Sequence, residues 1–160
     1  MNTTPPQRPL DRYFAGYAEY YRHPLNQAIG GVAVPAMAWS AVALLWCIPV
    51  FGTLAKTGIW AALAMFFAWS YYYRLSRPLG LGMLAVFFVF GCLCRLFEMR
   101  LGLTALLWTA AAVFAIGGIA QFVGYRIEGR RPAFLGDLRY LLVGPLWVLA
   151  RVYRRMDWKY

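Results

Sequence analysis

The sequence has very few of the side chains that enzymes most often use for chemistry. It contains one histidine, His23, and six acidic residues in 160 positions. Within one copy of the chain, this excludes an iron site of two histidines and one carboxylate, and a zinc site of three histidines. There is no G-x-S-x-G motif for a nucleophilic serine and no G-x-x-x-x-G-K cradle for phosphate. Hydrolytic and metal-dependent chemistry therefore lack their usual residues.

Charged residues are also scarce, and their scarcity indicates the class of protein. Only 14% of the residues are charged and 62% are apolar, whereas about 25% of the residues of an ordinary soluble domain are charged. A chain of 160 residues is long enough for one domain. In lipid, a helix satisfies all its backbone amides within one segment. The composition therefore predicts an all-α integral membrane protein.

Four apolar runs are long enough, or nearly so, for the roughly 17–25 residues that a transmembrane helix needs. The predicted spans are residues 30–51, 58–73, 79–96 and 101–123. Residues 10–24 combine tyrosines with arginines and predict a helix at the membrane interface. Residues 137–156 predict an interfacial or re-entrant helix pair, since Gly144 and Pro145 interrupt a short apolar stretch. Together these segments predict a single membrane domain over residues 1–160.

The basic residues are distributed unevenly around these spans. If four spans leave both termini on one side, thirteen of the sixteen lysines and arginines lie on that side. Because Lys and Arg are enriched in cytoplasmic loops, this predicts that both termini are cytoplasmic. The net charge of +10 is then explained by anionic lipid head groups as partners. No nucleic-acid partner is expected.

A polar face interrupts the apolar pattern where the fourth span ends. Gln121, Tyr125 and Glu128 are spaced i, i+4 and i+7. They share one face if the helix continues past Val123. We expect this face to point into the bundle or towards the cytoplasmic interface.

A second polar stretch precedes the first span. Pro24 suits the first turn of a helix, where its missing N–H is no loss. His23, just before it, is more simply a cap or a head-group contact than a metal ligand. Asn26 and Gly30 follow at i, i+4 spacing and present a small, partly polar surface.

The two polar stretches carry a family resemblance. "YYRHPLNQAIGGVAVP" at 20–35, and "QFVGYRIEGRRPA" at 121–133 followed by "DLRYLLVGPLWVLA", resemble two signature regions of the 2-hydroxy fatty acid dioxygenase family of phytosphingosine breakdown. That family includes a fungal endoplasmic-reticulum enzyme and bacterial inner-membrane proteins of unknown function. The second motif is matched at Gln121, Phe122, Val123, Gly124, Glu128, Arg130, Pro132 and Ala133. The resemblance implies four membrane helices, cytoplasmic termini, a bacterial inner membrane, and an Fe(II) site that uses O₂ to remove one carbon from a 2-hydroxy acyl chain.

The chain departs from the family pattern at the metal-binding positions. The resemblance places the family's ligand histidines at Tyr21, Gly30 and Tyr125 of this sequence. Gly30 has no side chain, and tyrosinate usually binds Fe(III) together with other ligands. His23 matches a position that is not a ligand in the family. The sequence therefore predicts a member of the family with no metal and no cofactor.

Three hypotheses follow. The first is a catalytically inactive member that binds a lipid or fatty acyl ligand between the first and fourth spans. The second is a structural or partner-binding membrane protein, whose arginines after Glu128 only stop the span. The third is an active oxygenase with an unusual ligand set, shared across a homodimer. A homo-oligomer stays open in all three. The candidate ligand-binding residues are His23, Asn26, Gln121, Glu128, Arg130 and Arg131.

Overall fold

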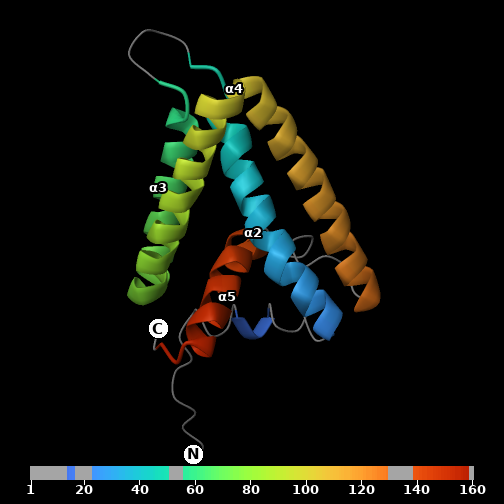
Figure 1. Ribbon diagram of the computed structural model, residues 1–160. Helices are drawn as coiled ribbons and strands as arrows, with labels where there is room; N and C mark the ends of the chain where they lie inside the picture. The colour runs from blue at the N-terminus through green and yellow to red at the C-terminus, as the bar shows by residue number, and fades with distance from the viewer. Residues whose placement is uncertain (1–13, 17–22, 51–55, 130–138, 159–160) are drawn as a thin grey trace, which may run out of the picture.

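The computed structural model describes residues 14–16, 23–50, 56–129 and 139–158 (Figure 1). Apart from a short helical turn at 14–16, the regular structure in these ranges consists of four helices and no strand. The helices are α2 (Pro24–Trp46), α3 (Ile59–Leu75), α4 (Arg77–Ile127) and α5 (Arg139–Arg155). The predicted all-α class is thus confirmed for the described part of the chain. Most of the predicted interfacial segment 10–24 lies outside it.

The helices form a splayed, inverted V (Figure 1). One leg pairs α3 with the first half of α4, and the other pairs α2 with the second half of α4. The red helix α5 lies at the open end, between the legs, and contacts both α2 and α4. Helix α4 is therefore the element that joins the two legs.

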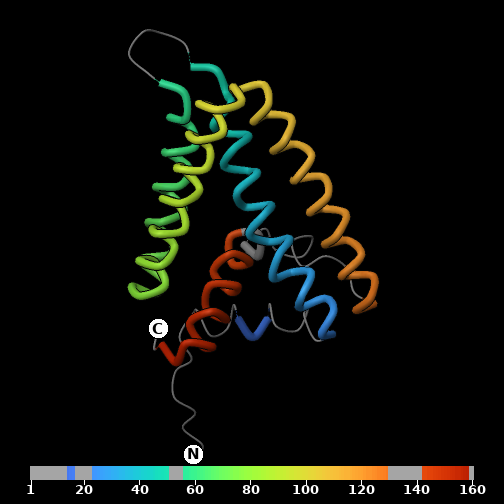
Figure 2. Tube along the Cα trace, in the orientation of Figure 1, coloured from blue at the N-terminus to red at the C-terminus, as the bar shows by residue number. Residues whose placement is uncertain are grey.

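The apex of the V is a bend within α4. Gly102 has non-helical angles there, with φ 84° and ψ 164°. A residue with a side chain is strained at such a φ, whereas glycine adopts it readily. The tube in Figure 2 turns back at this point, so the second half of α4 runs antiparallel to the first. The bend falls just after the predicted junction between 79–96 and 101–123.

Two helices are long and apolar enough by composition to cross a membrane, α2 and the 51-residue α4. Helix α3 is shorter, with 17 residues. Helix α2 begins and ends earlier than the predicted span 30–51, because it starts at the cap and ends at Trp46, ahead of Pro49. Pro35 lies inside the helix.

The prediction that Gly144 and Pro145 break the C-terminal segment into two helices is wrong. Helix α5 runs through both residues without interruption. Pro145 removes one amide from the helical ladder, and nearby the Tyr72 hydroxyl donates a 2.8 Å hydrogen bond to the Leu142 carbonyl. Val143 and Leu146, on either side of Pro145, are fully buried against α3 and α4. This packing stabilises one continuous helix.

The hydrophobic core has two parts, one at each end of the V. The lower part packs α5 against the leg made of α3 and the first half of α4, and it contains Phe14, Tyr72, Leu79, Met83, Val143, Leu146, Trp147 and Ala150. The upper part lies near the apex and contains Val42, Ala43, Ala61, Cys94, Leu106 and Ala110. Much of the remaining apolar surface points outwards. The side chains of Val32, Phe88 and Trp108 are 74%, 73% and 69% exposed.

Candidate functional site

Glu128 joins the end of α4 to the beginning of α2. Its Oε1 accepts a 2.6 Å hydrogen bond from the His23 backbone N–H and a 3.2 Å hydrogen bond from Asn26 Nδ2. The first amides of a helix have no partner within it, and the positive end of the helix dipole favours a negative charge. The carboxylate therefore satisfies α2 from a position more than a hundred residues away in the chain.

His23 is the N-cap of α2, as the sequence predicted. Its Nδ1 accepts a 3.2 Å hydrogen bond from the Leu25 backbone N–H, and Pro24 occupies the first turn. Nδ1 therefore carries no proton in this arrangement. The imidazole is exposed, and one of its two nitrogens is already occupied.

The side chain of Asn26 is fully buried against α4. A Cβ added at Gly124 would collide with Asn26 Oδ1. Only a glycine at this position lets the two helices approach so closely. The Asn26 amide of α2 therefore packs directly against Gly124 of α4.

The predicted face of α4 is present in the structure. The helix continues past Val123 to Ile127, as expected. Gln121 and Tyr125 are buried with 8% and 5% of their surface exposed, while Val123 faces outwards. Glu128 bonds the start of α2, and Gln121 and Tyr125 lie buried in the turns of α4 that precede it.

The remaining predicted positions separate into two groups. Gly30 is buried one turn beyond Asn26 in α2 and has no side chain to contribute. Tyr21, Arg130 and Arg131 lie outside the described residues. The structure thus gathers His23, Asn26, Gln121, Tyr125 and Glu128 at one end of the α2–α4 leg; these five are the polar cluster.

A second set of contacts, which was not predicted from the sequence, lies beside this cluster. Arg151 of α5 donates from Nη2 to Gln27 Oε1 at 2.8 Å and from Nη1 to the Gln27 carbonyl at 3.4 Å. Its guanidinium carbon lies 4.4 Å from the centre of the Trp147 ring. Burial lowers the pKa of Arg151, and the neighbouring charges of Arg155 and Arg154 lower it further. The only sequence signal was the i, i+4 spacing of tryptophan and arginine in α5.

A second carboxylate closes the apex of the V. Glu98 accepts hydrogen bonds from Thr57 Oγ1 at 2.8 Å, Arg95 Nη1 at 2.9 Å and Trp46 Nε1 at 3.2 Å. Arg95 and Glu98, three positions apart on α4, form a salt bridge. Burial alone would raise the pKa of Glu98, but these three donors and the Arg95 charge outweigh it and lower the pKa. Glu98 lies between the predicted spans and links α2, α4 and the turn before α3.

Comparison with known proteins decides the family. Residues 7–156 match the family described as "2-hydroxy-palmitic acid dioxygenase Mpo1-like". The chain belongs to the Mpo1-like family. The match includes both signature regions and nearly the whole chain. The resemblance that the sequence predicted is thus confirmed.

A curated relative supports the same assignment. The chain is 29% identical over 137 residues to the 2-hydroxy-palmitic acid dioxygenase MPO1 of Saccharomyces cerevisiae. The aligned region covers 84% of this chain and 74% of the yeast protein. No solved structure matches the chain. The family assignment therefore rests on sequence.

The side chains of the polar cluster do not fit the Fe(II) site that the family resemblance implies. The cluster offers one carboxylate, two amides, one phenol and an imidazole whose Nδ1 is taken. Non-haem Fe(II) oxygenases typically use two histidines and a carboxylate. Among the described residues, no group of three or more His, Cys, Asp or Glu side chains could hold a metal ion. No reaction step through iron can be derived from these residues.

Proposed function

We propose that this chain is a membrane-embedded member of the Mpo1-like family that binds a fatty acyl lipid at the polar cluster and is catalytically inactive as an iron dioxygenase. The observation that carries the proposal is the engagement of Glu128. Its Oε1 already accepts hydrogen bonds from the His23 amide and the Asn26 side chain. The one described carboxylate of the cluster thus has a structural role, and the positions that the resemblance assigns to ligand histidines hold tyrosine or glycine in this chain.

The proposed topology is four membrane spans with both termini in the cytoplasm of a bacterial cell. Support comes from the length and apolar composition of α2 and α4, and from the reversal of α4 at Gly102. Each half of α4 is long enough for the roughly 17–25 residues of a span. The amphipathic helix α5, with Arg151, Arg154 and Arg155, would lie at the cytoplasmic interface beside anionic head groups.

An acyl ligand suits the surroundings of the polar cluster. Next to the buried Gln121 and Tyr125, the side chains of Phe122 and Val123 are 53% and 46% exposed on α4. Leu25, at the start of α2, is 60% exposed. An amphiphile could place its carboxyl and hydroxyl groups at the cluster's amides and its chain along this apolar surface. The yeast relative's name supplies a ligand to test, 2-hydroxy-palmitic acid.

The test is a titration of the detergent-purified protein with 2-hydroxy-palmitic acid, with palmitic acid as the comparison ligand. We expect saturable binding that prefers the 2-hydroxy acid. Gln121→Ala and Glu128→Ala should each weaken it about ten-fold, which corresponds to about 1.4 kcal/mol. Thr104→Ala, at an exposed position near the bend of α4, is the matched control and should bind as the unmodified protein does.

The competing hypothesis of a structural or partner-binding protein makes the opposite prediction. Binding that is absent, or that is unchanged by both cluster substitutions, would favour it. Thermal unfolding of each variant, measured in the same detergent, separates a lost binding site from a lost fold. Glu128→Ala is expected to lower the unfolding temperature as well as the binding, so Gln121→Ala is the decisive variant. It supports the lipid site if it loses binding and keeps its unfolding temperature.

A further inference from the structure

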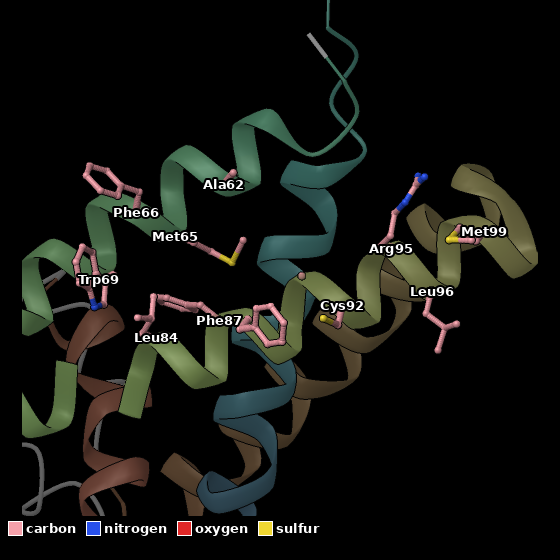
Figure 3. Close-up of a pocket in the computed structure, with 12 residues that line it drawn as sticks. Ala62, Met65, Phe66, Trp69, Leu84, Phe87, Cys92, Arg95, Leu96 and Met99 are labelled. Atoms are coloured by element: carbon pink, nitrogen blue, oxygen red, sulfur yellow. The ribbon is translucent and has the colours of Figure 1, made fainter. Parts of the chain in front are cut away.

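An apolar groove lies on the other leg of the V, away from the polar cluster. It has a volume of about 720 Å³ and runs between α3 and the first half of α4 (Figure 3). Met65, Phe66 and Trp69 line it from α3, and Phe87 lines it from α4. Figure 3 shows Trp69 and Leu84 at one end and Arg95 and Met99 at the other. A single charged residue thus stands at one end of an otherwise apolar lining.

The shape of the groove suits one extended hydrocarbon chain. From Leu84 to Met99 the lining follows about four turns of α4, or about 22 Å at a rise of 1.5 Å per residue. One leaflet of a bilayer has a hydrocarbon thickness of about 15 Å, half of the roughly 30 Å core. Phe66 and Phe88, both in the lining, are 56% and 73% exposed. The groove is therefore long enough for an acyl chain and open to the lipid along its side.

The middle of the groove is formed by a glycine that helix packing does not require. A Cβ at Gly80 would come within 2.6 Å of the Tyr73 backbone, so that glycine is needed for the contact between α3 and α4. A Cβ at Gly91 would have no other atom within 4 Å. A mid-helix glycine costs about 0.5–1 kcal/mol relative to alanine. Gly91 therefore leaves open space in the groove without serving the fold.

The charged end of the groove favours an anionic head group. The Arg95 side chain is 58% exposed even though it pairs with Glu98 at 2.9 Å. The carboxylate of Glu98 already accepts from Thr57 and Trp46 as well. Exposed Arg100 lies two positions after Glu98 in the chain, and exposed Lys56 directly precedes Thr57, which donates to that carboxylate. This end of the groove therefore has a net positive charge. Guanidinium groups bind phosphate oxygens strongly.

We propose that this groove binds one acyl chain of an anionic phospholipid, with the lipid phosphate at Arg95. The site is distinct from the polar cluster, which lies on the α2–α4 leg at the opposite end of the molecule. This proposal rests on the proposed membrane topology, because the leg of α3 and the first half of α4 must lie in a bilayer. It does not depend on ligand binding at the polar cluster. The bound molecule is a structural or regulatory lipid, and the positive charge at Arg95 selects it by its anionic head group.

The test is native mass spectrometry of the detergent-purified chain with phosphatidylglycerol, and with phosphatidylcholine carrying the same acyl chains. The unmodified protein should bind one phosphatidylglycerol saturably and prefer it to phosphatidylcholine. Gly91→Phe should fill the groove and weaken binding at least ten-fold. Gly118→Phe is the matched control, because a Cβ there also meets nothing within 4 Å and the residue lies outside the groove. It should leave lipid binding unchanged.

The head-group assignment has its own pair of variants. Arg95→Gln should reduce the preference for phosphatidylglycerol to near one while an acyl chain still binds. Arg100→Gln removes the same charge from outside the groove and should keep most of the preference. Equal effects of the two substitutions would show a diffuse charge effect and overturn the placement of the phosphate at Arg95.

Photo-crosslinking of a lipid to the unmodified protein tests the proposal even if a variant fails to fold. Phosphatidylglycerol with a diazirine in its acyl chain should crosslink to α3 and to residues 84–99 of α4. Labelling spread evenly over all outward-facing helix surfaces, or equal lipid binding by Gly91→Phe and Gly118→Phe, would contradict the proposal.

Gly91→Phe should leave the titration with 2-hydroxy-palmitic acid unchanged, and Glu128→Ala should leave phosphatidylglycerol binding unchanged. The two lipid sites can therefore fail independently.

Discussion

The Glu128 carboxylate accepts a 2.6 Å hydrogen bond from the backbone N–H of His23, 105 positions earlier in the chain. In a capping box, a glutamate in the first turn of a helix makes this bond to its own N-cap residue. Here the glutamate comes from the end of another helix. The same carboxylate also holds Asn26, so it sets both the start of α2 and the distance between α2 and α4.

Replacing Glu128 should weaken this junction. Glu128→Ala leaves the His23 amide and the buried Asn26 amide without this acceptor, which should cost about 1–3 kcal/mol. Glu128→Gln keeps an acceptor oxygen and loses only the charge at the helix N-terminus, so its effect should be smaller. Thermal unfolding in one detergent measures both. If Glu128→Ala unfolds at the same temperature as the unmodified protein, the carboxylate does not stabilise this junction.

Gly124→Ala should separate α2 from α4. Its Cβ would overlap Asn26 Oδ1, and the Asn26 side chain is fully buried and bonded to Glu128, so moving it would break that bond. We expect a loss of about 1–3 kcal/mol, as for other overpacked sites. Gly118→Ala adds the same methyl group to the same helix in open space and should be neutral or slightly stabilising. Equal unfolding temperatures for the two variants would contradict the close approach at Gly124.

Arg151 should hold α5 against the first turn of α2. Arg151→Lys loses the fork that contacts Gln27 and the planar group over Trp147, at a cost of about 1–2 kcal/mol. Arg154→Lys changes an exposed arginine of the same helix and serves as the control. Hydrogen exchange should speed up in α5 and around Gln27 for the first variant alone. Similar hydrogen-exchange rates in the two variants would show that the contacts of Arg151 with Gln27 and Trp147 do not hold α5 in place.

Glu98 should make the stability of the apex depend on pH. Its pKa is lower in the folded protein than in the unfolded chain, where glutamate titrates near about 4.3. The stabilisation is therefore fully present above that pH and is lost as the pH falls through the lower folded value. The unmodified protein should unfold at a higher temperature than Glu98→Gln at pH 6, and the difference should shrink towards pH 3. A difference that is constant with pH would contradict the shifted pKa.

The sequence predicted the local features of this molecule better than its long-range ones. The spacing of Gln121, Tyr125 and Glu128 predicted one helical face, and the His-Pro pair predicted the cap, because both depend on neighbours within two turns. The partner of Glu128 at the start of α2 and the partner of Arg151 at Gln27 lie 105 and 124 positions away. No periodicity carries that information. Helix α5 was wrongly divided because its contact with Tyr72 cannot be seen from α5 alone.

We propose that the polar cluster of this chain does not hold iron, and counting the metal bound to the purified protein tests this. The protein is purified from membranes with Fe(II) present and without oxygen, and its iron is counted per chain. A variant carrying Tyr21→His, Gly30→His and Tyr125→His is the positive comparison. We predict far less than one iron per unmodified chain, and a gain in the variant. One iron per unmodified chain, together with removal of one carbon from 2-hydroxy-palmitic acid that a chelator abolishes, would show that the chain is an active iron enzyme and contradict the proposal.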